Sequence, residues 1–135
     1  MARALSSSGY HADFSGSSLW EVERFFDDHA PDGHATPNGL LSEKLGQRIF
    51  ALGGYVGEVL RRNVGGIWEG DDDDPQAEIN VALRLADTAV VWPVQRVMKR
   101  YQNGSEDSVV VYAAALGVVV GPRPRSRRRR FRRRA

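Results

Sequence analysis

The chain has 135 residues, of which 41% are hydrophobic and 27% are charged, and it contains no cysteine. This length fits one domain, because single hydrophobic cores are typically built from about 100 to 150 residues. A chain without cysteine has no disulfide, thiol nucleophile or thiolate zinc site, so its stability must come from packing.

The formal net charge of +2 conceals two segments of opposite charge. Residues 1–122 hold ten basic and seventeen acidic side chains, a net charge of −7. The last thirteen residues hold no acid and nine arginines, namely Arg123, Arg125, Arg127, Arg128, Arg129, Arg130, Arg132, Arg133 and Arg134. The sequence therefore describes an acidic body followed by a basic tail.

Residues 1–17 are rich in Ser and Gly, with Tyr10 and Phe14 scattered among them. This composition buries too little apolar surface to offset the entropy of ordering, and it predicts a flexible leader. No apolar run of signal-peptide length follows Arg3, and Ala2 excludes N-myristoylation. We expect a cytoplasmic protein.

Two helices are predicted in the first half of the domain. Ser18 with Glu21 matches a capping box, and the apolar face that follows it predicts a helix ending near Pro31. Apolar residues at steps of three and four then predict a helix over residues 42–63. Glycines on one face of this helix indicate the close approach of another element, and they are Gly46, Gly53 and Gly57.

After Gly65 the hydrophobic period changes from helix to strand. Three short strands are predicted at residues 66–70, 78–85 and 88–92, and the first two are joined by a wide hairpin. Pro93 begins a further helix that closes at Asn103-Gly104. A last helix is predicted from Ser105, as its cap, toward Leu116.

The resulting order α-α-β-β-β-α-α predicts an α+β fold, with a small, mainly antiparallel three-stranded sheet and helices packed on one face. We divide the chain into a leader at residues 1–17, a single domain at 18–120 and a disordered Arg-rich tail at 121–135. The prolines Pro122 and Pro124 stop regular structure before the arginine run.

Four stretches of the chain carry a family resemblance: residues 54–62 (GYVGEVLRR), 65–68 (GGIW), 93–100 and 103–108 (NGSEDS). In this pattern, GxYxGEVxRR…GGxW and PxxxVxKR…NGxEDS, the chain resembles a family of small uncharacterised bacterial proteins. The resemblance covers roughly residues 41–116 and implies a bacterial source but no reaction. Some similar proteins look like partners of toxins or of secretion systems.

The most site-like cluster is Glu58 with Arg61 and Arg62, a carboxylate beside two guanidinium groups on one helix. Its structural interpretation is a set of i,i+3 and i,i+4 ion pairs on an exposed face. Its functional interpretation is anion binding by the two arginines, or an acid–base role for Glu58, which lacks a second acid or His beside it.

A second cluster places Asp27, His29, Asp32 and His34 within eight residues. These side chains are weak candidates for divalent metal ligands, because their spacing matches neither a His-Glu-x-x-His motif nor a calcium loop. They are also ordinary residues of helix ends and turns. We therefore assign no metal site and no cofactor.

Asp71–Asp74 form the densest acidic run, which is interpreted as a solvated hairpin tip or as a site onto which the tail folds back. The tail itself can neutralise phosphates without base specificity, or serve as an incidental solubilising extension. A membrane anchor is disfavoured because the apolar stretch at residues 109–121 is shorter than the roughly 20 residues that a span requires.

The sequence favours a non-enzymatic binding or regulatory module. In this interpretation the acidic body makes protein contacts and the Arg-rich tail makes non-specific contacts with nucleic acid. Two alternatives stay open: a small enzyme, metal-dependent or carboxylate-based, and a toxin-neutralising partner whose acidic body is the active surface. The sequence predicts no membrane contact and specifies neither the protein partner nor the oligomeric state.

Overall fold

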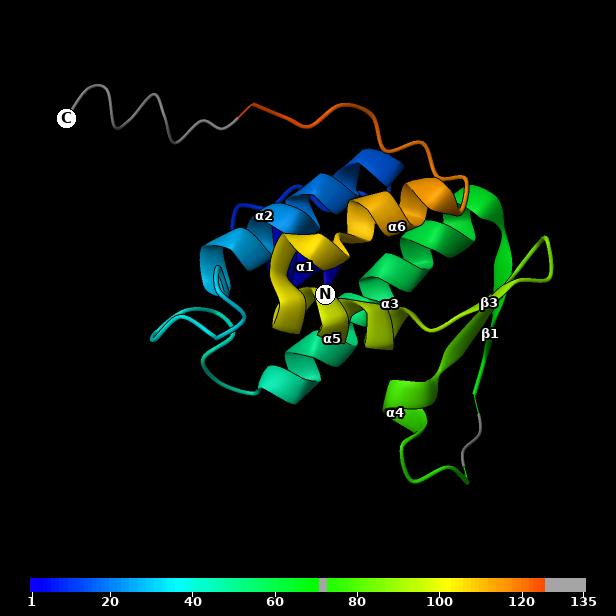
Figure 1. Ribbon diagram of the computed structural model, residues 1–135, viewed down its shortest axis with the longest axis horizontal. Helices are drawn as coiled ribbons and strands as arrows, with labels where there is room; N and C mark the ends of the chain where they lie inside the picture. The colour runs from blue at the N-terminus through cyan, green and yellow to red at the C-terminus, as the bar shows by residue number, and fades with distance from the viewer. Residues whose placement is uncertain (71–72, 126–135) are drawn as a thin grey trace.

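The structure is a computed structural model that describes residues 1–70 and 73–125. Its helices and strands follow in the order α1 (Ala2–Ser7), η1 (Gly16–Ser18), α2 (Leu19–His29), α3 (Leu45–Val64), β1 (Gly66–Glu69), α4 (Ala77–Asn80), β2 (Ala82–Leu85), β3 (Val90–Val91), α5 (Pro93–Asn103), η2 (Gly104–Asp107) and α6 (Val109–Ala115) (Figure 1). The predicted α+β class is confirmed.

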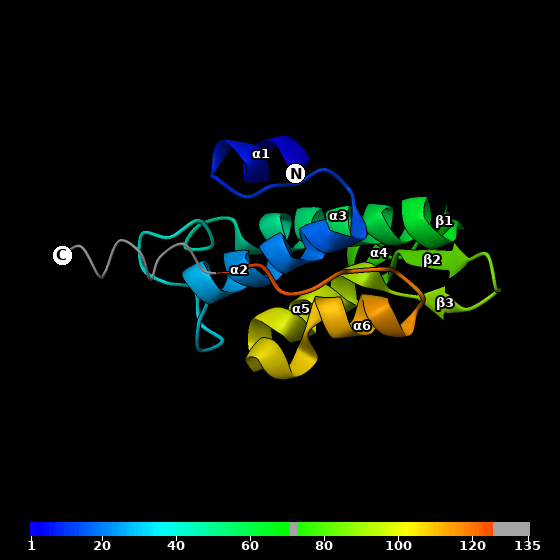
Figure 2. The ribbon, with the colours of Figure 1, turned by 90° about the horizontal axis from the view of Figure 1, so that it is seen from above.

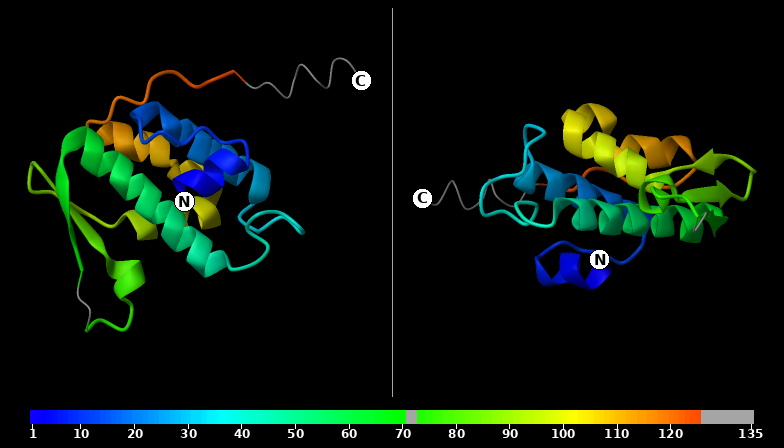
Figure 3. Two further views of the ribbon diagram at one scale, coloured as in Figure 1. Left: turned by 180° about the vertical axis from the view of Figure 1, so that it is seen from behind. Right: turned by 90° about the horizontal axis from the view of Figure 1, so that it is seen from below.

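The helices form layers beside a small sheet. Seen from above, α2 and α3 make a middle layer, with α1 on one side and α5 and α6 on the other (Figure 2). The views from behind and from below show the same order (Figure 3). The sheet lies at one end of this stack.

The sheet is antiparallel throughout, in the order β1-β2-β3. Leu83 and Leu85 of β2 are buried, whereas Arg84 between them is exposed, as strand alternation requires. The helices cover the face that carries the two leucines, so the prediction of helices on one face is confirmed. The predicted strand at residues 78–85 is too long, because residues 77–80 form α4.

The long helix α3 passes through the core. Its buried side includes Ile49, Leu52, Val56 and Leu60, which are 0 to 6% exposed. The predicted close approach is confirmed at two of the three glycines. A Cβ at Gly53 would lie 2.6 Å from Val94 Cα, and one at Gly57 would overlap the Trp68 ring, whereas Gly46 faces open space.

The N-terminal segment belongs to the core, which corrects the expectation of a flexible leader. Leu5 of α1 is 1% exposed and Tyr10 is 4% exposed. The Tyr10 ring packs edge-on against Phe25 at a centroid distance of 5.4 Å. The Tyr55 hydroxyl, whose pKa is raised by burial, accepts a hydrogen bond from the backbone N–H of Phe14 at 3.1 Å. A few well-placed large side chains thus order a segment whose average composition is polar.

The helix caps differ from the predicted ones. α2 begins after Ser18, but the Ser18 hydroxyl donates to the Ser15 carbonyl and contacts the Tyr55 hydroxyl, so no capping box forms. α6 is capped by Ser108, whose hydroxyl accepts a hydrogen bond from the N–H of Val111. Ser105 lies in η2 instead.

The last described residues run across the surface without forming a strand. The Trp20 indole N–H donates to the carbonyls of Val120 and Gly121 at 3.2 and 3.1 Å, which fixes this segment on α2. Residues 121–125 are exposed and lead along α2 toward the end of the molecule opposite the sheet (Figure 1, Figure 2). Within the described part of the chain, no helix is long and apolar enough to cross a membrane.

Candidate functional site

The cluster of Glu58, Arg61 and Arg62 forms as the sequence predicts, but Trp68 of β1 completes it. Arg61 donates two hydrogen bonds to the Glu58 carboxylate, at 2.7 and 3.0 Å. The Trp68 indole N–H donates to Glu58 Oε2 at 2.8 Å, and Arg62 Nε lies 3.5 Å from Glu58 Oε1. The carboxylate thus joins α3 to β1.

The environment of Glu58 keeps it ionised. The hydrogen bond from Arg61 outweighs partial burial and, with the donors Trp68 and Arg62, lowers the pKa of Glu58 from 4.5 to about 2. An acid with such a pKa is a poor proton donor or acceptor near neutral pH. Two N–H groups of the Arg61 guanidinium already donate to Glu58, so fewer are available to an external anion. This arrangement favours a structural role.

Arg62 turns toward the N-terminal segment. Its guanidinium carbon lies 3.9 Å from the centroid of the Phe14 ring, a cation–π contact. Phe14 has φ = 64°, the left-handed region, and its ring also packs against Tyr55 at 4.9 Å. Arg62 therefore helps to hold the N-terminal segment on α3.

The four candidate metal ligands do not converge. The described residues contain no group of three or more His, Asp or Glu side chains placed to hold a metal ion. Asp27 Oδ1 accepts from Arg100 at 3.1 Å, and His29 Nδ1 accepts from the N–H of Leu40 at 3.2 Å. Asp32 accepts from the backbone N–H of His34 at 3.2 Å, which is a turn interaction.

A buried ion pair that sequence reasoning missed joins three helices. Arg100 of α5 is 1% exposed, and its Nε donates to Glu23 Oε1 of α2 at 2.8 Å. The other Glu23 oxygen accepts from the N–H of Val109, at the start of α6, at 2.8 Å. The sequence signal for this pair is Glu23, an acid next to Val22 on the apolar side of α2. A charged residue at such a position is buried only when it is paired.

The basic tail is the candidate polyanion-binding segment, and the structure describes its first residues, 121–125, which we call the tail root. Arg123 lies 5.9 Å from the Trp20 ring centroid, and its Nη2 is 3.9 Å from Asp27 Oδ2. Its side chain is 73% exposed, and Arg125 is also exposed. The other tail arginines, Arg127, Arg128, Arg129, Arg130, Arg132, Arg133 and Arg134, lie outside the described residues.

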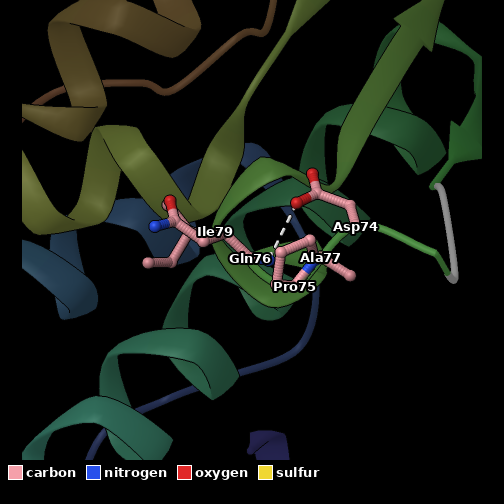
Figure 4. Close-up of a pocket in the computed structure, with 5 residues that line it drawn as sticks. All are labelled: Asp74, Pro75, Gln76, Ala77 and Ile79. Atoms are coloured by element: carbon pink, nitrogen blue, oxygen red, sulfur yellow. Dashed lines mark hydrogen bonds between the residues drawn. The ribbon is translucent and has the colours of Figure 1, made fainter.

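The acidic run is described only at Asp73 and Asp74, so the prediction that the tail folds back on Asp71–Asp74 falls outside the described residues. Asp74 accepts from the N–H of Gln76 at 2.8 Å and from the Asn80 amide at 3.0 Å. An open hollow of about 310 Å³ beside this turn is lined by Asp74, Pro75, Gln76, Ala77 and Ile79 (Figure 4). These bonds shape the turn into α4, and the hollow is too open to enclose a ligand.

The outer face of the sheet exposes apolar side chains. Ile67 is 70% exposed and Trp92, the residue after β3, is 44% exposed. Ile67 pairs with Arg84, which pairs in turn with Val90, so these three side chains form one row across the face. The exposure of an aromatic residue as large as Trp92 makes this face a candidate protein-contact surface.

Comparisons with protein-family models, curated proteins and solved structures found no match to this chain. The resemblance to a bacterial family stays a prediction.

Proposed function

We propose that this protein is a non-enzymatic binding module whose C-terminal arginines contact a polyanion, most simply nucleic acid, while the acidic body contacts a protein. The observation that carries the proposal is the separation of charge along the chain, with nine arginines in the last thirteen residues and a net charge of −7 before them. Clustered arginines neutralise phosphates and release counterions, which drives binding without base specificity.

The ion pairs of the body support the assignment of polyanion contact to the tail. Among the described residues, six of the ten body bases form ion pairs with body carboxylates, and they are Arg24, Arg61, Arg62, Arg84, Arg96 and Arg100. Such bases are already partly neutralised. The body as a whole therefore repels a phosphate backbone, and the tail must supply the attraction.

The geometry of the tail root supports the same assignment. Trp20 anchors Val120 and Gly121 on α2, so the basic segment leaves the body at a defined point. Arg123 at this root is 73% exposed, which leaves its guanidinium accessible to phosphate. The exposed sheet face with Ile67 and Trp92 offers the body an apolar surface for a protein contact.

Titration of a labelled single-stranded oligonucleotide with the full chain tests this proposal. Replacing two tail charges (Arg128→Gln with Arg129→Gln) should weaken binding severalfold at low salt, because each lost arginine removes a phosphate contact. The matched control removes two body charges (Lys44→Gln with Lys99→Gln) and should change binding much less. Equal losses in the two variants would mean that net charge, and not the tail, governs binding.

A further inference from the structure

The outer sheet face is a surface that the fold leaves uncovered. Ile67, Val90 and Trp92 contribute apolar area to it, and the helices pack on the opposite face. Within the described strands, Arg84 is the one basic residue, and its guanidinium is already paired with Glu69 at 2.6 Å. The face therefore offers apolar contacts without a free cation.

Carboxylates follow one another at and shortly after the end of β1. Glu69 is the last residue of β1, and Asp73 and Asp74 follow a short distance along the chain. Glu69 is paired with Arg84, so the three carboxylates against this one guanidinium leave a net charge of −2. A ligand that complements this end of the face must therefore bring positive charge together with at least one large apolar side chain. Two copies of the face placed against each other would instead bring like charges together, which disfavours a symmetric pairing.

The chain itself contains a segment with that chemistry. Residues 126–135 read SRRRRFRRRA, seven arginines around the aromatic Phe131, and lie beyond the described residues. We propose that this segment of one copy binds the outer sheet face of a second copy, with Phe131 against Ile67 and Trp92 and the arginines near Glu69, Asp73 and Asp74.

The position of the tail root is the reason to assign a second copy. Residues 121–125 run along α2 away from the sheet, so the segment that follows starts at the opposite end of the molecule (Figure 1, Figure 2). To approach the sheet of its own copy, the segment would have to reverse this direction. A head-to-tail contact between copies needs no reversal.

This inference rests on the proposed function and adds a regulation to it. The same arginines cannot pair with carboxylates and with phosphates at once, so assembly and polyanion binding compete. Polyanion binding then releases the assembled copies, and it exposes the sheet face for the protein partner.

A peptide-binding experiment tests the contact directly. The probe is a fluorescein-labelled synthetic peptide of residues 121–135, and the receptor is the full chain with its nine tail arginines changed to Gln. We expect binding at low salt that weakens about tenfold or more with Ile67→Lys, and about threefold with Ile67→Thr, which adds no charge. The matched control is Val111→Lys on α6, where the native side chain is 69% exposed, and it should leave binding within about twofold.

Two further measurements test the roles of Phe131 and of the second copy. Phe131→Ser in the peptide should weaken binding severalfold. Non-specific electrostatic attraction between the arginines and the acidic body would not depend on the aromatic ring. In sedimentation equilibrium the mass of the full chain should rise with concentration, and the Ile67→Lys chain should stay monomeric. A full chain that is monomeric at every concentration, or equal losses from Ile67→Lys and Val111→Lys, would overturn the inference.

The oligonucleotide titration separates failure of this inference from failure of the proposed function. If the oligonucleotide binds through the tail but peptide binding is unchanged by Ile67→Lys, only the sheet contact is contradicted. If both hold, Ile67→Lys should strengthen oligonucleotide binding at protein concentrations where the wild type assembles. Val111→Lys adds the same charge and should have a smaller effect.

Discussion

At the scale of single residues, Gly57 shows how a missing side chain positions β1. The Trp68 ring occupies the space where a Cβ of residue 57 would lie, and the Trp68 indole N–H bonds to Glu58 on the next position of α3. A side chain at residue 57 would displace the ring and break this bond. The glycine is therefore a packing requirement of the α3–β1 contact.

Gly57→Ala should lower the free energy of unfolding by about 1 to 3 kcal/mol, the usual cost of overpacking a filled site. Gly54→Ala on the same helix is the matched control, because nothing lies within 4 Å of a Cβ at residue 54. That substitution should stabilise the protein by about 0.5 to 1 kcal/mol through helix propensity. Urea denaturation of the two variants measures both effects, and a stabilised Gly57→Ala variant would refute the packing role.

Arg100 is the residue whose loss should cost most. Its removal leaves the Glu23 carboxylate, which is 7% exposed, without its cation. Arg100→Met should lower the free energy of unfolding by about 3 to 5 kcal/mol, the range for breaking a buried ion pair. Arg84→Met is the control, because the Arg84–Glu69 pair is exposed and its loss should matter little. Thermal denaturation compares the stability of the two variants. Equal losses of stability in Arg100→Met and Arg84→Met would show that the Arg100 network is not buried.

At the scale of elements, Glu58 ties α3 to β1 in a way that depends on pH. The pKa of Glu58 is lowered from 4.5 to about 2 in the folded protein, chiefly by Arg61. The stabilisation is fully present above pH 4.5 and is lost as the pH falls toward 2, because the folded carboxylate must then take up a proton.

Glu58→Gln should therefore flatten the dependence of stability on pH across that window. The difference between the wild type and the variant should be on the order of 1 kcal/mol at pH 6, since the ion pair is partly exposed and screened. It should shrink toward pH 2. Chemical denaturation at a series of pH values measures the two curves, and parallel curves would show that Glu58 does not carry the effect.

The turn between β2 and β3 holds a residue in an unfavourable backbone conformation. Thr88 has φ = 74°, and β-branched residues rarely adopt the left-handed region. The turn is closed by the bonds from the Leu85 N–H to the Ala89 carbonyl and from the Thr88 N–H to the Leu85 carbonyl. Thr88 is strained because the hairpin has no glycine at the position where its backbone adopts a positive φ.

Thr88→Asn should stabilise the hairpin by about 0.5 to 1 kcal/mol, because Asn tolerates positive φ and adds little freedom to the unfolded chain. Thr88→Val keeps the branched Cβ and is the control, which should bring no gain. Thermal unfolding of the two variants tests the effect of backbone strain. A destabilised Thr88→Asn variant would contradict it.

How well each element could be predicted from the sequence depends on its length. α3 and α5 have long apolar faces, and their extents were predicted to within about three residues. Residues 78–81 were assigned to a strand because Ile79 and Val81 alternate with polar residues, but two alternations cannot distinguish a strand from the short turn of α4. Cap assignment failed at Ser18 for a different reason, since tertiary contacts with Tyr55 engage the hydroxyl that local rules assign to the cap.

At the scale of the whole molecule, the sequence predicted one ion-pair cluster, that of Glu58, and missed the other, that of Arg100. Glu58, Arg61 and Arg62 are neighbours on a helix, so their spacing alone brought them together. Glu23 and Arg100 lie 77 positions apart, and only the packing of α2 against α5 and α6 makes them partners. The core role of residues 1–17 was missed similarly, because burial of Leu5 and Tyr10 depends on a surface that the average composition does not reveal.

The salt dependence of oligonucleotide binding tests the central claim, that a basic tail and not the acidic body contacts polyanions. For the full chain, log affinity against log salt should fall with a slope of about −0.7 for each phosphate of a single strand that the tail neutralises. The chain with its nine tail arginines changed to Gln keeps its length and should show almost no binding and no slope. Retained binding with an unchanged slope in that variant would contradict the account.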